Sequence, residues 1–150
     1  MKPAKSGTNL LMICIDANLI IQHFVTPDHP AISKIWLEWT QNRIQFMAPT
    51  LIHFELANAF YRYRVHHVLS QEAAEKGLKA ALEIPIELVQ DNDLNVEAFK
   101  LADHYRLPAT YDAYYLALAL RHNVDFWTAD QRLWNILEPH KLAWLNFVPY

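Results

Sequence analysis

The stretch Leu10-Leu11-Met12-Ile13-Cys14-Ile15-Asp16 decides the fold class, because an unbroken apolar run ends abruptly at an acid. Such a run is typical of a strand buried on both faces, as the strands of parallel sheets are. It is too short to span a membrane and lacks a signal-peptide cleavage pattern. We therefore expect the first strand of a parallel sheet, in a cytoplasmic protein without a membrane partner.

Beyond this strand, apolar runs alternate with segments of helical periodicity. Thr50, Ser70 and Asp93 are expected to cap three of the helices, and Asp130 to begin a short one. Alternating strands and helices indicate βαβ crossovers, hence an α/β fold with a parallel five-stranded sheet and helices on both faces. The expected helices span 28–41, 51–66, 70–82, 94–105 and 111–121, and the later strands span 44–47, 86–89, 124–128 and 143–147.

Length and composition set the class of protein. The 150 residues fit one domain, which we place at 10–150 after a flexible polar tail at 1–9. With 53% hydrophobic and 19% charged residues, the chain is not disordered. The only glycines, Gly7 and Gly77, exclude a Walker loop and a GxGxxG fingerprint. The single cysteine, Cys14, excludes a disulfide framework and is expected to be an inert core thiol.

Four acidic residues stand alone in apolar surroundings. Asp16 follows the first strand, and Asp130 follows the strand at 124–128. Glu55 is the only charge in LIHFELANAFY at 51–61, and Asp112 is the only charge in LPATYDAYYLALAL at 107–120. Each has an ordinary alternative, since the three aspartates can cap helices and Glu55 can pair with Arg62 or stay exposed.

Taken together, the four acids favour a shared site. Groups that follow parallel strands gather beyond the carboxyl edge of the sheet. Four carboxylates in one place repel one another unless a cation is present, and all-oxygen ligands suit Mg²⁺ or Mn²⁺. Such a site can hydrolyse a phosphodiester with a metal-activated water.

At these positions the sequence resembles the PIN-domain ribonucleases, and most closely the VapC-type toxins of toxin–antitoxin pairs. The likeness covers about residues 11–148. It is carried by Asp16-Ala17-Asn18, by Glu55 in a helix, by Tyr111-Asp112-Ala113 with Tyr115-Leu116-Ala117, and by Thr128-Ala129-Asp130-Gln131-Arg132-Leu133.

The resemblance implies a three-layer α/β/α sandwich and an endoribonuclease that depends on Mg²⁺ or Mn²⁺. It assigns the catalytic and metal-binding roles to Asp16, Glu55, Asp112 and Asp130, of which Asp130 occupies the position that varies most. Asn18 and Thr128 match polar residues that support the site. The resemblance also implies a homodimer and a small antitoxin protein whose peptide blocks the acidic groove.

Other charged and aromatic residues are weighed against this site. Arg62, Arg64 and Arg121 flank the acidic helices and are candidates for gripping RNA phosphates, or else ordinary surface arginines. Trp36 and Trp39 are expected to fill the core or a dimer face. The net charge of −3 lacks a basic footprint for RNA. With four acids assigned to a metal site, 13 basic residues stand against the 12 remaining acids, so the charge does not exclude RNA.

Three further functions compete with a ribonuclease toxin. A phosphatase of the haloacid-dehalogenase type would use Asp16 as its nucleophile, but it needs a second acid where Asn18 stands. A PIN-domain nuclease could process RNA outside a toxin–antitoxin pair. A non-catalytic PIN scaffold could bind RNA or protein, although the presence of all four acids argues against such decay.

Overall fold

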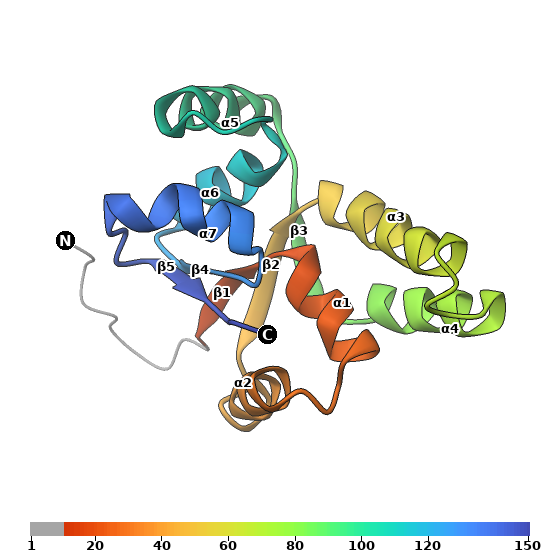
Figure 1. Ribbon diagram of the computed structural model, residues 1–150. Helices are drawn as coiled ribbons and strands as arrows, with labels where there is room; N and C mark the ends of the chain where they lie inside the picture. The colour runs from red at the N-terminus through yellow and green to blue at the C-terminus, as the bar shows by residue number, and fades with distance from the viewer. Residues whose placement is uncertain (1–10) are drawn as a thin grey trace.

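The computed structural model describes residues 11–150 and shows one parallel sheet (Figure 1). The tail expected at 1–9 lies outside the described residues. The strands lie in the order β3-β2-β1-β4-β5, and every pairing between neighbours is parallel. The five-stranded parallel sheet predicted from the sequence is thus confirmed. The strands are β1 (Met12–Ile15), β2 (Gln45–Pro49), β3 (Ile86–Val89), β4 (Asp125–Thr128) and β5 (Leu145–Phe147).

The helices of the described chain fill the connections between these strands. The structure has α1 (Ala17–Val25), α2 (Pro30–Gln41), α3 (Leu51–Val65), α4 (Gln71–Leu82), α5 (Asn92–Tyr105), α6 (Tyr111–His122), α7 (Gln131–Leu137) and the 3₁₀ turn η1 (Glu138–His140). Within residues 11–150, none of them is long and apolar enough to cross a membrane.

The strand order places the helices in two layers. From β1 the chain first adds β2 and β3 on one side, and then adds β4 and β5 on the other side. Right-handed crossovers therefore put α1 to α4 on one face of the sheet and α5 to α7 on the opposite face. The contacts agree, because α1 packs against α2, α3 and α4, whereas α6 packs against β1, β2 and β4. In Figure 1, α5 lies outside α6, and α3 and α4 lie side by side at the right.

This arrangement creates a switch point between β1 and β4. Adjacent strands there send their connections to opposite faces, so the chain diverges beyond their carboxyl ends. Such a divergence leaves a crevice, and ligands of open α/β sheets bind in it. The fold therefore directs attention to Asp16 and to the residues that follow Thr128.

Both faces of the sheet are covered by one continuous core. Cys14, Ile15 and Phe126 of the central strands are fully buried, as the unbroken apolar run predicts. Cys14 is the inert core thiol expected, and burial raises its pKa well above the usual value. Trp36 and Trp39 are buried and pack edge to face, with ring centroids 5.3 Å apart. They belong to the core.

The helix caps confirm some sequence predictions and correct another. The Ser70 hydroxyl accepts a hydrogen bond from the Ala73 N–H, as a helix cap does. The helix expected to start after Asp93 begins two residues earlier instead, because the carboxylate of Asp91 accepts a hydrogen bond from the Leu94 N–H. Thr50 precedes α3, but its side chain makes no capping hydrogen bond.

Gly77 is required by close packing between α3 and α4. A Cβ atom at this position would lie 2.6 Å from Cε1 of Phe60, which is buried in α3. Real Cβ atoms do not approach a ring carbon so closely, so the missing side chain lets the two helices meet. Gly77 therefore has a packing role and no part in phosphate binding.

Candidate functional site

Asp16 stands where β1 meets its neighbour β4. Its backbone N–H donates to the Trp127 carbonyl at 3.2 Å, which extends the ladder between the two strands. One carboxylate oxygen caps α1 by accepting from the Leu19 N–H at 3.1 Å, and the other accepts from the Thr128 hydroxyl. Capping and a place in the site are thus compatible, and both carboxylate oxygens have protein partners.

The environment of Asp16 opposes its negative charge. The side chain is only 7% exposed, and burial is the main cause that raises its pKa to about 7. The hydrogen bonds from Thr128 and Leu19 act in the opposite direction. The charges of Asp112 and Asp130 raise the pKa further, so three of the predicted carboxylates lie close enough to repel one another.

Thr128 links the ends of the two central strands. It is the last residue of β4 and is fully buried. Its hydroxyl donates to Asp16 and accepts from the Asp130 N–H at 3.0 Å. One side chain therefore orients the first carboxylate and fixes the start of the loop that carries the fourth.

Replacing Thr128 by Val is expected to impair any chemistry that depends on Asp16. The substitution keeps the shape of the side chain but removes the hydroxyl that holds the carboxylate. Loss of a group that orients a metal ligand typically costs about 10- to 100-fold in affinity or activity. Divalent-ion affinity, measured by calorimetry, should fall by this factor in Thr128→Val and recover in Thr128→Ser. An unchanged affinity in the Val variant would remove Thr128 from the site.

Asp130 begins the helix that follows β4. Its Oδ1 accepts from the backbone N–H groups of Arg132 at 2.8 Å and Leu133 at 3.1 Å, so the residue caps α7 as expected. The guanidinium of Arg132 lies 3.9 Å from the same oxygen and is 93% exposed. A pair this exposed adds little stability. Arg132 is therefore free to face a ligand from the rim.

Glu55 reaches the site from the middle of α3, on one face of the sheet. The hydroxyl of Tyr115, which comes from α6 on the other face, donates to Glu55 Oε1 at 3.3 Å. Burial is the main cause that raises the pKa of Glu55 to about 8, and the charges of Asp16 and Asp112 add to it. The Tyr115 ring stacks on Phe126 of β4 with centroids 5.7 Å apart. Tyr115 thus positions Glu55, a role that the sequence did not reveal.

Asp112 lies in the first turn of α6. Burial raises its pKa, the charge of Asp130 raises it further, and Arg132 opposes the rise. The expected alternative cap, Thr110, makes no side-chain hydrogen bond to the helix. Asp112 therefore completes a group of four acids that come from four different elements or their ends.

A cleft of about 700 Å³ exposes three of these acids to solvent. Glu55, Asp112 and Asp130 line it, together with Phe54, Asn58, Tyr111 and Arg132 among others. Asp16 is buried and is not part of the lining, but its charge acts on Glu55. Three of the four carboxylates thus line the cleft, and the buried Asp16 acts on the site through its charge.

The donor set fits a divalent cation by its chemistry. Carboxylate oxygens are the ligands that Mg²⁺ and Mn²⁺ prefer, and a cation would offset both the burial and the mutual repulsion that raise the pKa of three of the four acids. Within residues 11–150, however, no three Asp, Glu, His or Cys side chains are already placed to hold a metal ion. Ligation therefore requires the carboxylates to move closer together.

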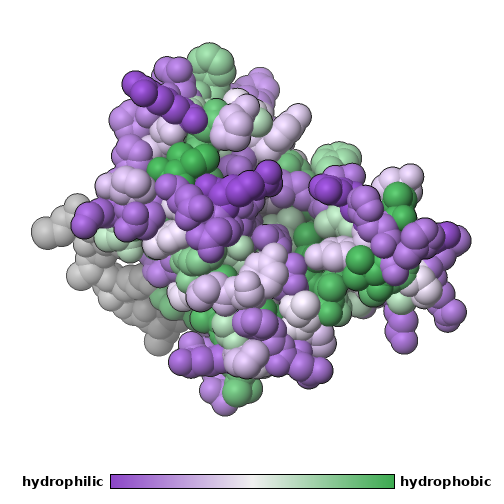
Figure 2. Space-filling view, in the orientation of Figure 1, coloured by the Kyte–Doolittle hydropathy of each residue, from purple (hydrophilic) through white to green (hydrophobic). Residues whose placement is uncertain are grey.

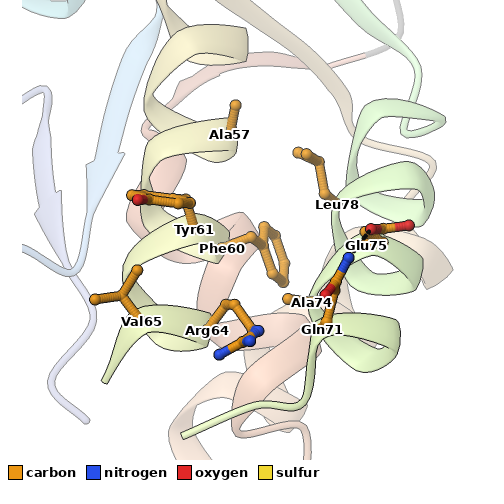
Figure 3. Close-up of a pocket in the computed structure, with 9 residues that line it drawn as sticks. All are labelled: Ala57, Phe60, Tyr61, Arg64, Val65, Gln71, Ala74, Glu75 and Leu78. Carbon is orange, nitrogen blue, oxygen red and sulfur yellow. Dashed lines mark hydrogen bonds between the residues drawn. The ribbon is translucent and has the colours of Figure 1, made fainter. Parts of the chain in front are cut away.

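The three predicted RNA-binding arginines do not share the cleft. Arg121 is held by carboxylates on the α5 side, with Asp91 at 2.6 Å and Glu97 at 3.1 Å. Arg64 lies at a second cavity, of about 490 Å³, between α3 and α4 (Figure 3). Arg62 lines a third cavity, of about 360 Å³, which it shares with Asn18. Arg62 is the one of the three that lies beside a predicted site residue.

Asn18 belongs to a hydrogen-bond network in the first turn of α1. Its Oδ1 accepts from Gln22 Nε2 and from the Tyr150 hydroxyl, each at 3.4 Å. Gln22 is buried and also contacts the hydroxyl of Tyr150 at 3.1 Å. The end of the chain thus fixes the side chain that the sequence predicts to support the site, although 132 positions separate Tyr150 from Asn18.

Known structures show the same architecture. A toxin–antitoxin complex from Klebsiella pneumoniae matches with a TM-score of 0.58 and 16% identity, over 81% of this chain and 89% of that chain. PAE2754 from Pyrobaculum aerophilum matches with a TM-score of 0.66 and 19% identity, over 95% of this chain and 93% of that chain. VapBC2 from Rickettsia felis, bound to a DNA fragment from its promoter, matches with a TM-score of 0.64 and 11% identity, over 93% of this chain and 99% of that chain. These likenesses concern the fold.

The family assignment comes from the sequence itself. No curated protein matches the chain. The PIN domain model, in contrast, matches residues 13–136, which include all four acids and both strands of the switch point. The chain therefore belongs to the PIN domain family, a family of nucleases.

Proposed function

We propose that this protein is a metal-dependent endoribonuclease and the toxin of a type II toxin–antitoxin pair. One observation carries the proposal. Four carboxylates from β1, α3, α6 and the end of β4 meet at the switch point of the sheet, and burial and mutual repulsion raise the pKa of Asp16, Glu55 and Asp112. A protein bears this electrostatic strain where a cation is to be bound.

The residues of the proposed site have two kinds of role, which are to bind the metal and to position the ligands. Asp16, Glu55, Asp112 and Asp130 are the proposed metal ligands. Bound Mg²⁺ or Mn²⁺ would supply an activated water and neutralise charge on the phosphoryl group. Thr128 orients Asp16, and Tyr115 orients Glu55, through the hydrogen bonds described above. No side chain has to act as a nucleophile.

A covalent phosphatase mechanism is disfavoured by the residue two positions after Asp16. That mechanism needs a carboxylic acid there, whereas Asn18 is an amide whose Oδ1 accepts hydrogen bonds from Gln22 and Tyr150. Incubation with a phosphate ester should therefore trap no aspartyl-phosphate.

Removal of divalent ions is expected to abolish RNA cleavage. A chelator should reduce the rate to that of the uncatalysed reaction, and Mg²⁺ or Mn²⁺ should restore it. The ion should also stabilise the fold, by roughly 2.7 kcal/mol at a concentration a hundred times its Kd, because it binds only the folded state. Calorimetry and thermal unfolding measure this without RNA. Cleavage that persists at full rate in the chelator would contradict the proposal, and an absence of ion binding would favour the non-catalytic scaffold.

The proposed partners follow from the toxin assignment. We propose that this chain forms a homodimer that cleaves RNA in the cytoplasm, and that a small antitoxin inhibits it by covering the acidic groove with a peptide. The exposed apolar side chains of the α3–α4 pair, Val65 and Val68 among them, offer a surface for such contacts (Figure 2). Two of the similar structures support an antitoxin, since one is a toxin–antitoxin complex and the other is VapBC2 bound to DNA from its promoter.

The gene of the proposed antitoxin is expected as a small reading frame next to the gene of this protein. Its product, co-expressed with this chain, should co-purify with it and inhibit RNA cleavage. Light scattering of the isolated chain should give the mass of a dimer. An isolated gene without such a neighbour would favour a PIN-domain nuclease that processes RNA outside a toxin–antitoxin pair.

A further inference from the structure

We propose that Phe54 and Tyr111 form the two walls of a base-stacking subsite that holds RNA bases on either side of the scissile phosphodiester. The inference rests on the proposed ribonuclease function and adds two binding residues to it. It concerns the cleft of about 700 Å³ that contains Glu55, Asp112 and Asp130.

The first observation is the exposure of the two rings. Phe54 is 77% exposed and Tyr111 is 65% exposed, although each lies in a well-formed helix with a buried side. Within residues 11–150, neither ring contacts another aromatic ring, whereas Trp36, Trp39 and Tyr115 all do. The rings therefore contribute little to the core and are available to a ligand.

The second observation is where the rings stand. Phe54 directly precedes Glu55 in α3, and Tyr111 directly precedes Asp112 in α6. These helices belong to opposite layers of the sandwich, so the rings enter the cleft from its two sides. Each ring is therefore next in sequence to one of the carboxylates that line the cleft.

The third observation is the charge at the rim. Arg132 lines the same cleft, is 93% exposed and makes only a long contact of 3.9 Å with Asp130. A guanidinium can pair with a phosphate oxygen, and a ring can stack on a base whatever its identity. The cleft thus combines carboxylates, a cation that can pair with a phosphate and rings that can stack on bases.

This chemistry suits a nucleic-acid strand as the substrate of the cleft, for which the proposed antitoxin peptide would compete. A strand places its phosphates at the carboxylate–metal centre and its bases against the rings. Stacking also requires that the bases be unpaired, because paired bases already stack on their neighbours. The bases beside the cleaved bond must therefore be splayed out of any duplex.

The test compares alanine variants of the two rings with a matched control. Phe54→Ala and Tyr111→Ala should each lower kcat/KM for a short unpaired RNA about 5- to 100-fold, because stacking contributes on this scale for each base. Phe54→Trp and Tyr111→Phe should retain it, since they keep a ring. Phe99→Ala is the control, because Phe99 is 67% exposed on α5 and does not line the cleft. It should behave as the unaltered protein does.

A binding experiment separates this inference from the proposed function. In an Asp16→Asn background, which removes cleavage, an RNA that carries 2-aminopurine should lose fluorescence on binding as its base stacks, and both alanine variants should weaken this quenching. Ring-dependent quenching in this background, together with no cleavage of the same RNA by the protein that retains Asp16, would contradict the nuclease and leave the subsite standing. If both alanine variants bind and cleave as Phe99→Ala does, the subsite is wrong and the rings are left for a protein partner.

Discussion

Asp16→Asn will reduce RNA cleavage at least 100-fold while leaving the fold intact. Loss of a group that merely orients a metal ligand costs about 10- to 100-fold, so loss of a charged ligand itself should cost more. Asn retains an oxygen for the Leu19 N–H and is as good a helix cap as Asp, so α1 keeps its start. Initial rates with Mg²⁺ or Mn²⁺ measure the effect, and Asp28→Asn, an exposed acid between α1 and α2, serves as the control.

The direction in which Asp16→Asn changes the stability of the protein can also be predicted. Because the pKa of Asp16 in the folded protein is raised to about 7, the folded state holds this proton more tightly than the unfolded state does. Stability is therefore lost as the pH rises from about 4 towards 7, and the loss is complete above 7. Asn does not titrate, so at pH 8 the metal-free variant should unfold at a temperature no lower than the unaltered protein. Full cleavage activity together with a lower unfolding temperature would remove Asp16 from the site and leave it a structural cap.

Phe126→Ala will cost about 3–5 kcal/mol of unfolding free energy, the usual range for a fully buried Phe. That is a large part of the roughly 5–15 kcal/mol that stabilises a domain. Phe126 lies in the central strand β4 and stacks on the ring of Tyr115. The substitution therefore removes the support of the hydroxyl that holds Glu55. Urea denaturation measures the free energy, and a loss below about 1 kcal/mol would contradict the packing described here.

Tyr115→Phe distinguishes the loss of core packing around Phe126 from the loss of the hydrogen bond that positions Glu55. It keeps the ring on Phe126 and deletes only the hydroxyl. If the site depends on Glu55 being held, this variant should lose activity while its stability changes far less than that of Phe126→Ala. The pair of variants thus distinguishes a weakened core from a displaced carboxylate.

Strand β1 could be predicted because the sequence features that define it are local. A strand buried on both faces must be apolar throughout, and the run ending at Ile15 is. The helix caps were harder to predict, since Asp91 and Asp93 are equally plausible two residues apart and only the path of the chain decides between them. Helix α1 was not among the helices expected from the sequence, which offered only Asp16 as a cap for it.

The acids of the site could be predicted because a lone carboxylate in an apolar segment is costly unless it has a purpose. Partners contributed by distant segments could not be predicted. Tyr115 reaches Glu55 from 60 positions away, and Arg121 is held by Asp91 and Glu97 across the α5–α6 contact. The exposure of the Phe54 and Tyr111 rings could not be predicted either, because the sequence does not distinguish an exposed aromatic residue in an apolar helix from one in the core.

The place of β1 in the sheet has a consequence for synthesis of the protein. Its neighbour β4 is made more than a hundred residues later, so β1 remains an open edge until residue 128 has left the ribosome. Unpaired apolar edges of this kind invite aggregation, and a nascent chain must shield this one until then. Until the same moment, Asp112 and Asp130 have no place beside Asp16. A chain that ends before Asp130 therefore lacks part of the acidic cleft and should not carry the proposed activity.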